Sequence, residues 1–172
     1  MPRITPFLWF DNQAEEAARF YTSVFPSSRI IELIRYGNDG PGYPGDVMTV
    51  RFELDGQEFL GLNGGPAHGG PAHGETGESG ESGGSGESIS FVVSCKSQDE
   101  VDYFWSQLSA GGEEGSCGWL QDRYGMSWQI VPDRLLELLA DDEEERARRV
   151  MRAMLEMTKL DIEALERAMV AS

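Results

Sequence analysis

The sequence predicts an α+β fold in which one β-α-β-β-β unit occurs twice and is followed by C-terminal helices. Three observations predict it. Strand-like and helix-like apolar patterns follow one another in the same order in both halves of the 172-residue chain. The halves align at a constant offset of 84 residues, which places Phe91 on Phe7 and Trp105 on Tyr21. A tract without large apolar residues separates the two halves.

The first unit is predicted within residues 1–63. It begins with an apolar strand at 4–10, and a helix follows where Asn12 and Glu15 have the spacing of a capping box, with Asn in place of Ser or Thr. Pro26 ends this helix. Apolar and alternating patterns, the last two joined by an Asp-Gly hairpin turn, then predict three strands, at 28–35, 47–54 and 57–63.

The second unit is predicted within residues 89–131 and repeats this order. An apolar strand at 89–95 precedes a helix that begins with a strict capping box, Ser97 to Glu100, and stops at Gly111-Gly112. Short strand patterns follow at 114–117, 118–122 and 127–131. The two units are therefore predicted to have the same secondary structure.

Residues 64–88 are predicted to be a solvated, mobile linker between the two units, because they are rich in Gly, Ser and Glu. They contain the unit Gly-Gly-Pro-Ala-His twice, ending at His68 and His73, and we interpret this as repeat expansion and not as a metal site. Residues 132–172 are predicted to form helices, the last of them capped by Asp161.

Composition excludes several classes of function. The net charge of −16 argues against binding to nucleic acid or to anionic membrane surfaces, both of which need clustered Lys and Arg. No apolar run approaches the roughly 20 residues of a membrane span, and the first residues lack a secretory signal pattern. We expect a cytoplasmic protein in which Cys95 and Cys117 are free thiols.

Two strings carry a resemblance to a known family: "ITPFLWFDNQAEEAARFYTSVF", residues 4–25, and "CGWLQDRYGMSWQIVP", residues 117–132. They resemble the PhnB-like branch of the glyoxalase/bleomycin-resistance superfamily, also called vicinal oxygen chelate (VOC), whose members often have the label 3-demethylubiquinone-9 3-methyltransferase. The tail string "RVMRAMLEMTKLDIEALERA", residues 149–168, also resembles this branch. The resemblance implies a VOC/glyoxalase-like fold, two β-α-β-β-β modules forming an open, cupped mixed sheet, usually in a homodimer.

The resemblance also implies where a metal would lie. Superfamily enzymes hold a divalent metal with His and Glu from strands of both modules. In this chain the corresponding positions fall at Thr5 or Pro6, near Asn63, within 88–90 and at Gln129. None of these is His, Asp, Glu or Cys, the residues that such a site needs. We therefore expect no metal at the superfamily site, and no cofactor.

The residues leave open whether the protein is an enzyme. A methyltransferase site of the Rossmann type needs a Gly-rich turn between strand and helix, and the turns after Phe10 and Cys95 contain no glycine. Neither cysteine has a neighbouring His in the sequence, or a local basic cluster, that would make it a nucleophile.

Three hypotheses remain. The first is a metal-free protein that binds a small, partly apolar molecule in its cup. Its candidate pocket residues are aromatic side chains with polar anchors: Trp9, Asn63, Ser90, Trp119, Trp128 and Gln129. The second is a metal-dependent glyoxalase, dioxygenase or resistance enzyme with unusual ligands. The third is a structural or interaction protein that uses its acidic helical tail.

Overall fold

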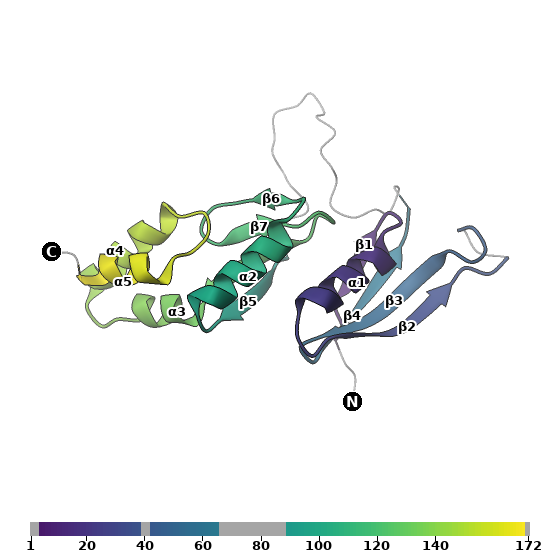
Figure 1. Cartoon of the computed structure of the whole chain (residues 1–172), viewed down its shortest axis with the longest axis horizontal. Coiled ribbons are helices and arrows are strands. Elements are labelled where there is room, and N and C mark those ends of the chain that lie inside the picture. The colour runs from purple at the N-terminus through teal and green to yellow at the C-terminus, as the bar shows by residue number, and fades with distance from the viewer. Residues whose placement is uncertain (1–3, 39–41, 66–88, 171–172) are drawn as a thin grey trace, which may run out of the picture. The chain divides into compact units, whose positions relative to one another are not determined.

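The computed structural model describes residues 4–38, 42–65 and 89–170 (Figure 1). The chain divides into two compact units, Met1–Ser79 and Gly80–Ser172. The predicted linker lies outside the described residues except for Gly64 and Gly65, and so do His68 and His73.

The first unit is a four-stranded mixed sheet with one helix, as predicted. The strands lie in the order β1-β4-β3-β2, in which β1 and β4 are parallel and the other pairs are antiparallel. Its elements along the chain are β1 (Phe7–Phe10), α1 (Ala14–Val24), β2 (Arg29–Arg35), β3 (Val47–Leu54) and β4 (Gln57–Asn63).

Small residues let α1 lie close to this sheet. Ala14, Ala17 and Ala18 are fully buried on one side of the helix, together with Tyr21, whose ring stacks 6.2 Å from that of Phe52. A close approach of this kind excludes side chains of ordinary size, because van der Waals contacts in a core are already near optimal. The alanines therefore define which face of the sheet is covered.

The second unit repeats the topology of the first. Its strand order is β5-β8-β7-β6. As in the first unit, the strands that come first and last along the chain, here β5 and β8, form the one parallel pair. α2 begins 84 residues after α1, in agreement with the offset found in the sequence. The elements are β5 (Phe91–Cys95), α2 (Gln98–Ser109), β6 (Glu113–Glu114), β7 (Trp119–Gln121) and β8 (Ser127–Pro132).

Three helices follow β8, as the sequence predicted, and the structure shows that they have a core of their own. They are α3 (Asp133–Leu139), α4 (Glu144–Leu155) and α5 (Ile162–Val170). The core consists of aliphatic side chains that are at most 4% exposed: Leu135, Leu138, Val150, Leu160 and Leu165. The predicted cap at Asp161 is confirmed, since its Oδ1 accepts a hydrogen bond of 2.7 Å from Ala164 N.

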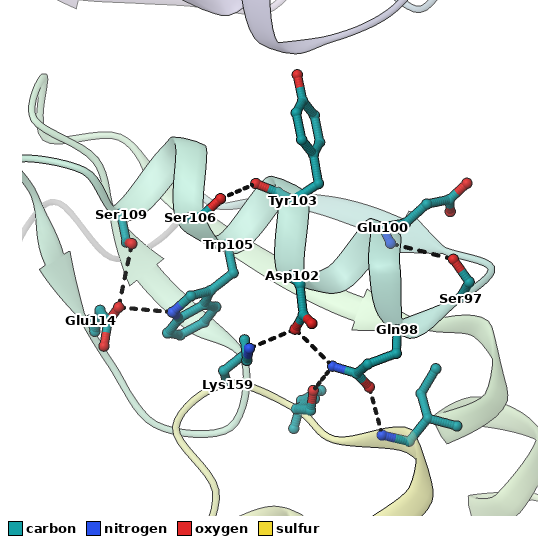
Figure 2. Close-up of polar contacts among 12 residues, drawn as sticks. Ser97, Gln98, Glu100, Asp102, Tyr103, Trp105, Ser106, Ser109, Glu114 and Lys159 are labelled. Atoms are coloured by element: carbon teal, nitrogen blue, oxygen red, sulfur yellow. Dashed lines mark hydrogen bonds and ion pairs between the residues drawn. The ribbon is translucent and has the colours of Figure 1, made fainter.

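The two predicted capping boxes had different outcomes. In the second unit Ser97 Oγ accepts a hydrogen bond from Glu100 N, as predicted (Figure 2). In the first unit the predicted box of Asn12 and Glu15 is wrong, because the N-cap residue is Gln13 and its side chain makes no capping bond. Asn63 takes this role from β4, since its Oδ1 accepts from Ala14 N at 2.8 Å.

Both cysteines are free, as predicted, and they differ in exposure. Cys95 is fully buried, whereas Cys117 is partly exposed. Burial raises the pKa of the Cys95 thiol to about 12, and the negative charges of Glu100 and Asp133 add to this shift. Among the residues that the structure describes, no helix has the length and apolar character needed to cross a membrane.

Candidate functional site

Within the described residues, each sheet has one face covered by its helix and an opposite face without a helix (Figure 1). The helix-free faces are the candidate sites. Because side chains alternate along a strand, neighbouring residues point to opposite faces. In the first unit the buried residues Phe10, Phe52 and Phe59 lie on the helix-covered face. The helix-free face of this sheet therefore carries the side chains of the residues next to these three in each strand.

The helix-free face of the first sheet carries an exposed aromatic pair. Phe7 and Trp9 lie edge to face with ring centroids 5.8 Å apart, and they are 43% and 40% exposed. Leu60 and Leu62 lie beside them, since β4 pairs with β1 at these positions. Farther across the sheet the face becomes charged, where Arg51 lies 3.4 to 3.7 Å from two glutamates. This face is thus apolar at β1 and ionic at β3.

The helix-free face of the second sheet has a row of three residues across its strands. Gln129 of β8 pairs with Val92 of β5 on one side and with Trp119 of β7 on the other. Gln129 Nε2 also donates a hydrogen bond of 2.9 Å to Ser90 Oγ. Val92 is 57% exposed and Trp119 is 38% exposed. An apolar surface and a polar anchor therefore lie next to each other.

A cavity of about 510 Å³ adjoins this row. Trp119, Gln121 and Ser127 line it from the sheet, and Cys117 lines it from the connection between β6 and β7. Alternation assigns seven positions of β5, β7 and β8 to this helix-free face, and none of them is ionisable: Val92, Ser94, Trp119, Gln121, Ser127, Gln129 and Val131. On the edge strand β6, Glu113 pairs with Gln121 and so lies on the same face, and both Glu113 and Glu114 line the cavity. The surface beside the cavity is therefore uncharged over β5, β7 and β8 and acidic at β6.

Four of the six predicted pocket residues lie on helix-free faces. Ser90, Trp119 and Gln129 come together in the second unit, while Trp9 lies in the first. The sequence missed the connection that carries Cys117, because it took residues 114–117 for a strand and the structure ends β6 at Glu114.

The other two predicted residues have structural roles instead. Asn63 makes three hydrogen bonds within the fold. Its side-chain Oδ1 caps α1, and its Nδ2 donates to Val47 O at 2.9 Å. Its backbone carbonyl oxygen accepts from Tyr36 Oη at 2.8 Å. Trp128 is 4% exposed on the helix-covered face, and its Nε1 donates to Asp122 Oδ2 at 2.8 Å. Trp128 and Gln129 are neighbours in β8 and so point to opposite faces, and the sequence does not show which of the two faces the helix covers.

Buried Asp122 is a structural residue of the turn before β8. It is 3% exposed, and its Oδ1 accepts hydrogen bonds from the backbone N–H groups of Tyr124 and Met126. Together with the bond from Trp128 these contacts join the turn before β8 to the core. Its carboxylate is therefore occupied by the fold and is not offered to a ligand.

A second cavity, of about 600 Å³, lies at the start of α1 in the first unit. Its lining includes Glu15, Arg35, Tyr36 and Asn63. Arg35 lies 3.6 Å from Glu15 and donates to Gly45 O, so these charges already have partners. The sequence gave no sign of this cavity except Asn63, and the contacts of that residue serve the fold.

The residues at the superfamily metal positions do not fit a metal. Thr5 offers a hydroxyl, Ser90 and Gln129 are bonded to each other, and the side chain of Asn63 is directed to the start of α1. Divalent metals of this class prefer imidazole, thiolate or carboxylate ligands. No group of three or more His, Cys, Asp or Glu side chains within the described ranges could hold a metal ion.

Comparison with known proteins gives matches over both units. A family model described as 3-demethylubiquinone-9 3-methyltransferase matches residues 2–73 and 75–131. The chain is similar to the structure of a putative 3-demethylubiquinone-9 3-methyltransferase, PhnB protein, from Bacillus cereus, with 32% identity and a TM-score of 0.60. That match covers 76% of this chain and 99% of the other chain. No curated protein matches.

A second structure, the protein PA1353 from Pseudomonas aeruginosa, has 20% identity and a TM-score of 0.55, with 77% of this chain and all of that chain covered. It is similar in fold. The α+β fold with two β-α-β-β-β modules is thereby confirmed. The family match ends at residue 131, so it leaves out the tail, although the string 149–168 had suggested that the resemblance continues there. The tail is therefore treated as an addition to the matched region.

Proposed function

This chain belongs to the PhnB-like, 3-demethylubiquinone-9 3-methyltransferase family of the glyoxalase/bleomycin-resistance superfamily, and on that premise we propose that it binds a small, uncharged, partly apolar molecule. The binding surface is the helix-free face of the second sheet. The observation that carries the proposal is the row of Val92, Gln129 and Trp119 beside a cavity of about 510 Å³.

The aromatic side chain supplies the larger part of the binding free energy. Covering the exposed part of a tryptophan contributes on the order of 1–2 kcal/mol, and stacking with a planar ring adds to it. A hydrogen bond to Gln129 contributes about 1 kcal/mol or less, because the ligand gives up a bond to water to form it. Trp119 therefore sets affinity, and the amide sets orientation.

The uncharged strands of this face favour an uncharged ligand. A charged group placed against Val92 and Trp119 loses its hydration, and no side chain of β5, β7 or β8 on this face offers it a compensating charge. The carboxylate of Glu113, on the edge strand β6, repels an anion. An uncharged group that donates or accepts hydrogen bonds finds partners in Gln129 and in the hydroxyl of Ser90. We therefore expect a planar, neutral molecule with at least one amide, carbonyl or hydroxyl group.

No observation favours methyl transfer by this chain. The connections between β1 and α1 and between β5 and α2, both described in full, contain no glycine that would cradle a nucleotide cofactor. The family name is for this reason not carried over as an activity.

The proposal is tested with 2-naphthamide, a neutral planar probe that has an amide group. Equilibrium dialysis should give saturable binding to the wild-type protein, and Trp119→Ala should weaken it about tenfold or more, in line with the area that the ring contributes. Tyr103→Ala is the matched control, because Tyr103 is 44% exposed on α2 of the same unit and points away from the labelled polar groups (Figure 2). Equal loss in both variants, or no saturable binding, would refute the proposal.

The same family premise supports a homodimer, which we also propose. Light scattering coupled to size exclusion should give twice the chain mass of 19.0 kDa. A monomer mass at all concentrations used in the binding assay would contradict it.

A further inference from the structure

The tail is attached to the second unit through the segment between α4 and α5, residues 156–161, which we call the strap (Figure 1). Two consecutive carbonyl oxygens of the strap accept hydrogen bonds from the connection between β6 and β7. Cys117 N donates to Met157 O at 2.7 Å, and Gly118 N donates to Thr158 O at 2.8 Å. The connection thus directs two consecutive backbone N–H groups to the strap, which a non-extended backbone allows.

α2 holds the strap from the other side. Gln98 Nε2 donates to Leu160 O at 3.1 Å, and Gln98 Oε1 accepts from Ile162 N at 2.9 Å. Lys159 makes an ion pair with Asp102, as Figure 2 shows beside the contacts of Gln98. Asp102 accordingly has a lowered pKa, through its hydrogen bonds from Lys159 and then Gln98. The strap is therefore fixed to α2 and to the connection at the same time.

The connection needs such support because its backbone is strained. Cys117 has φ of +59°, a left-handed conformation that residues with a side chain adopt at an energetic cost, and Gly118 follows with φ of +83°. Leu160 fills the space against Gly118, where an added Cβ would come within 3.0 Å of it. Cys117 also lines the cavity beside Trp119, so the shape of that cavity depends on this connection.

We propose that the strap holds the connection at Cys117 and Gly118 in the shape that the ligand needs, so that the C-terminal tail sets the affinity of the cavity beside Trp119. Met157, Thr158 and Leu160 are then positioning residues that do not touch the ligand. The proposal rests on the proposed function, and it goes beyond that function in assigning a role to a segment outside the family match.

The test loosens the strap from the side away from the cavity. Gln98→Ala removes both bonds from α2 to the strap, and Gln107→Ala is the matched control on an exposed position of the same helix. The reporter is alkylation by iodoacetamide, a neutral reagent, followed by peptide mass analysis at each cysteine. Cys95 lies buried in the same unit and reports on unfolding.

The expected result is selective. In Gln98→Ala the alkylation rate of Cys117 should rise about tenfold, as expected when two hydrogen bonds that hold a local structure are lost, and 2-naphthamide should bind several-fold more weakly. Cys95 should stay unreactive in both variants, and Gln107→Ala should match the wild type. If Gln98→Ala does not fold, Lys159→Ala is the milder variant, with the same direction and a smaller rise.

Three other results would overturn the proposal in whole or in part. An unchanged rate at Cys117 in a folded variant overturns the proposal, and so does a faster rate with unchanged probe affinity, since the strap would then hold the connection without affecting the cavity. A rise at Cys95 together with Cys117 means general unfolding and also overturns it. Absence of probe binding by the wild-type protein overturns the proposed function and the affinity claim, while the cysteine rates still decide whether the strap holds the connection.

Discussion

The two units share a topology and differ in the chemistry of their helix-free faces. In the first, Phe7 and Trp9 form an exposed aromatic pair, and the neighbouring strands carry ion pairs around Arg51. In the second, Trp119 lies beside the amide of Gln129, on strands that carry no ionisable side chain on this face. The covered faces are alike because packing against a helix demands small and apolar residues there. The helix-free face is under no such demand, and it is where the two copies have diverged.

The units also differ in the side chains that fix their helices and turns, and substitutions at these side chains should have the largest effect on the free energy of unfolding. Asp122→Ala should lower the free energy of unfolding by about 3–4 kcal/mol, because it leaves the buried Nε1 of Trp128 and two backbone N–H groups without an acceptor. Urea denaturation measures this change. Asp142→Ala, at an exposed position, should stay within about 0.5 kcal/mol of the wild type. A loss below about 1 kcal/mol for Asp122→Ala would show that the turn is held in another way.

The next effect separates the two ways of capping a helix. Asn63→Ala should cost about 2 kcal/mol, because it removes the cap of α1 and the bond to Val47 O together. Ser97→Ala in the second unit should cost about 1 kcal/mol. Asn12→Ala, at the capping position that the sequence suggested, should cost little. The same denaturation experiment ranks the three variants, and a larger loss for Asn12→Ala than for Asn63→Ala would reverse the assignment.

A charge can be placed at Gln129 of β8, a strand with no ionisable side chain on this face, to test the contrast with the first unit. Gln129→Glu should weaken binding of 2-naphthamide about tenfold, because the carboxylate must be desolvated against Val92 and the probe. Gln129→Met keeps the size and loses the amide, so it should weaken binding only a few-fold. Dialysis measures both. Equal effects of the two variants would mean that charge does not matter on this face.

The smallest effect concerns pH and the buried thiol. The pKa of Cys95 is raised from 9.0 to about 12 in the folded protein by burial, so unfolding above pH 9 releases a proton that the folded state keeps. Stability from this group is fully present below pH 9 and is lost as pH rises toward 12. Cys95→Ala should remove about 1 kcal/mol of the loss between pH 9 and pH 10. The wild-type and Cys95→Ala curves of stability against pH should therefore diverge above pH 9, and identical curves would contradict the assignment.

The order of elements was predictable from the sequence because local signals and the core agree. The alternation in β3, the alanines of α1 and the capping box at Ser97 all indicate the structure that forms. Where the sequence analysis was wrong, a distant residue had replaced a local one. Asn63 lies at the end of β4, next to the end of β1, and reaches the start of α1 across the sheet, which no local pattern reveals.

The candidate site was predictable only in part. Alternation along β8 places Ser127 and Gln129 on one face of the sheet and Trp128 on the other. Which of these faces is buried depends on where α2 packs. No local sequence pattern predicts the shape of the connection at Cys117, because the residues that contact it belong to the strap, about 40 residues later in the chain. Contacts of that separation are fixed by tertiary packing and leave no periodic pattern behind.

The most direct test of the account follows the four tryptophan indole N–H signals during titration with 2-naphthamide in ¹⁵N-labelled protein. Trp128 is buried and hydrogen-bonded to Asp122, so its signal should stay in place as an internal reference. The account predicts a saturable shift of the Trp119 signal. A Trp119 signal that does not move while Trp9 shifts, or no shift at all at millimolar probe, would contradict it.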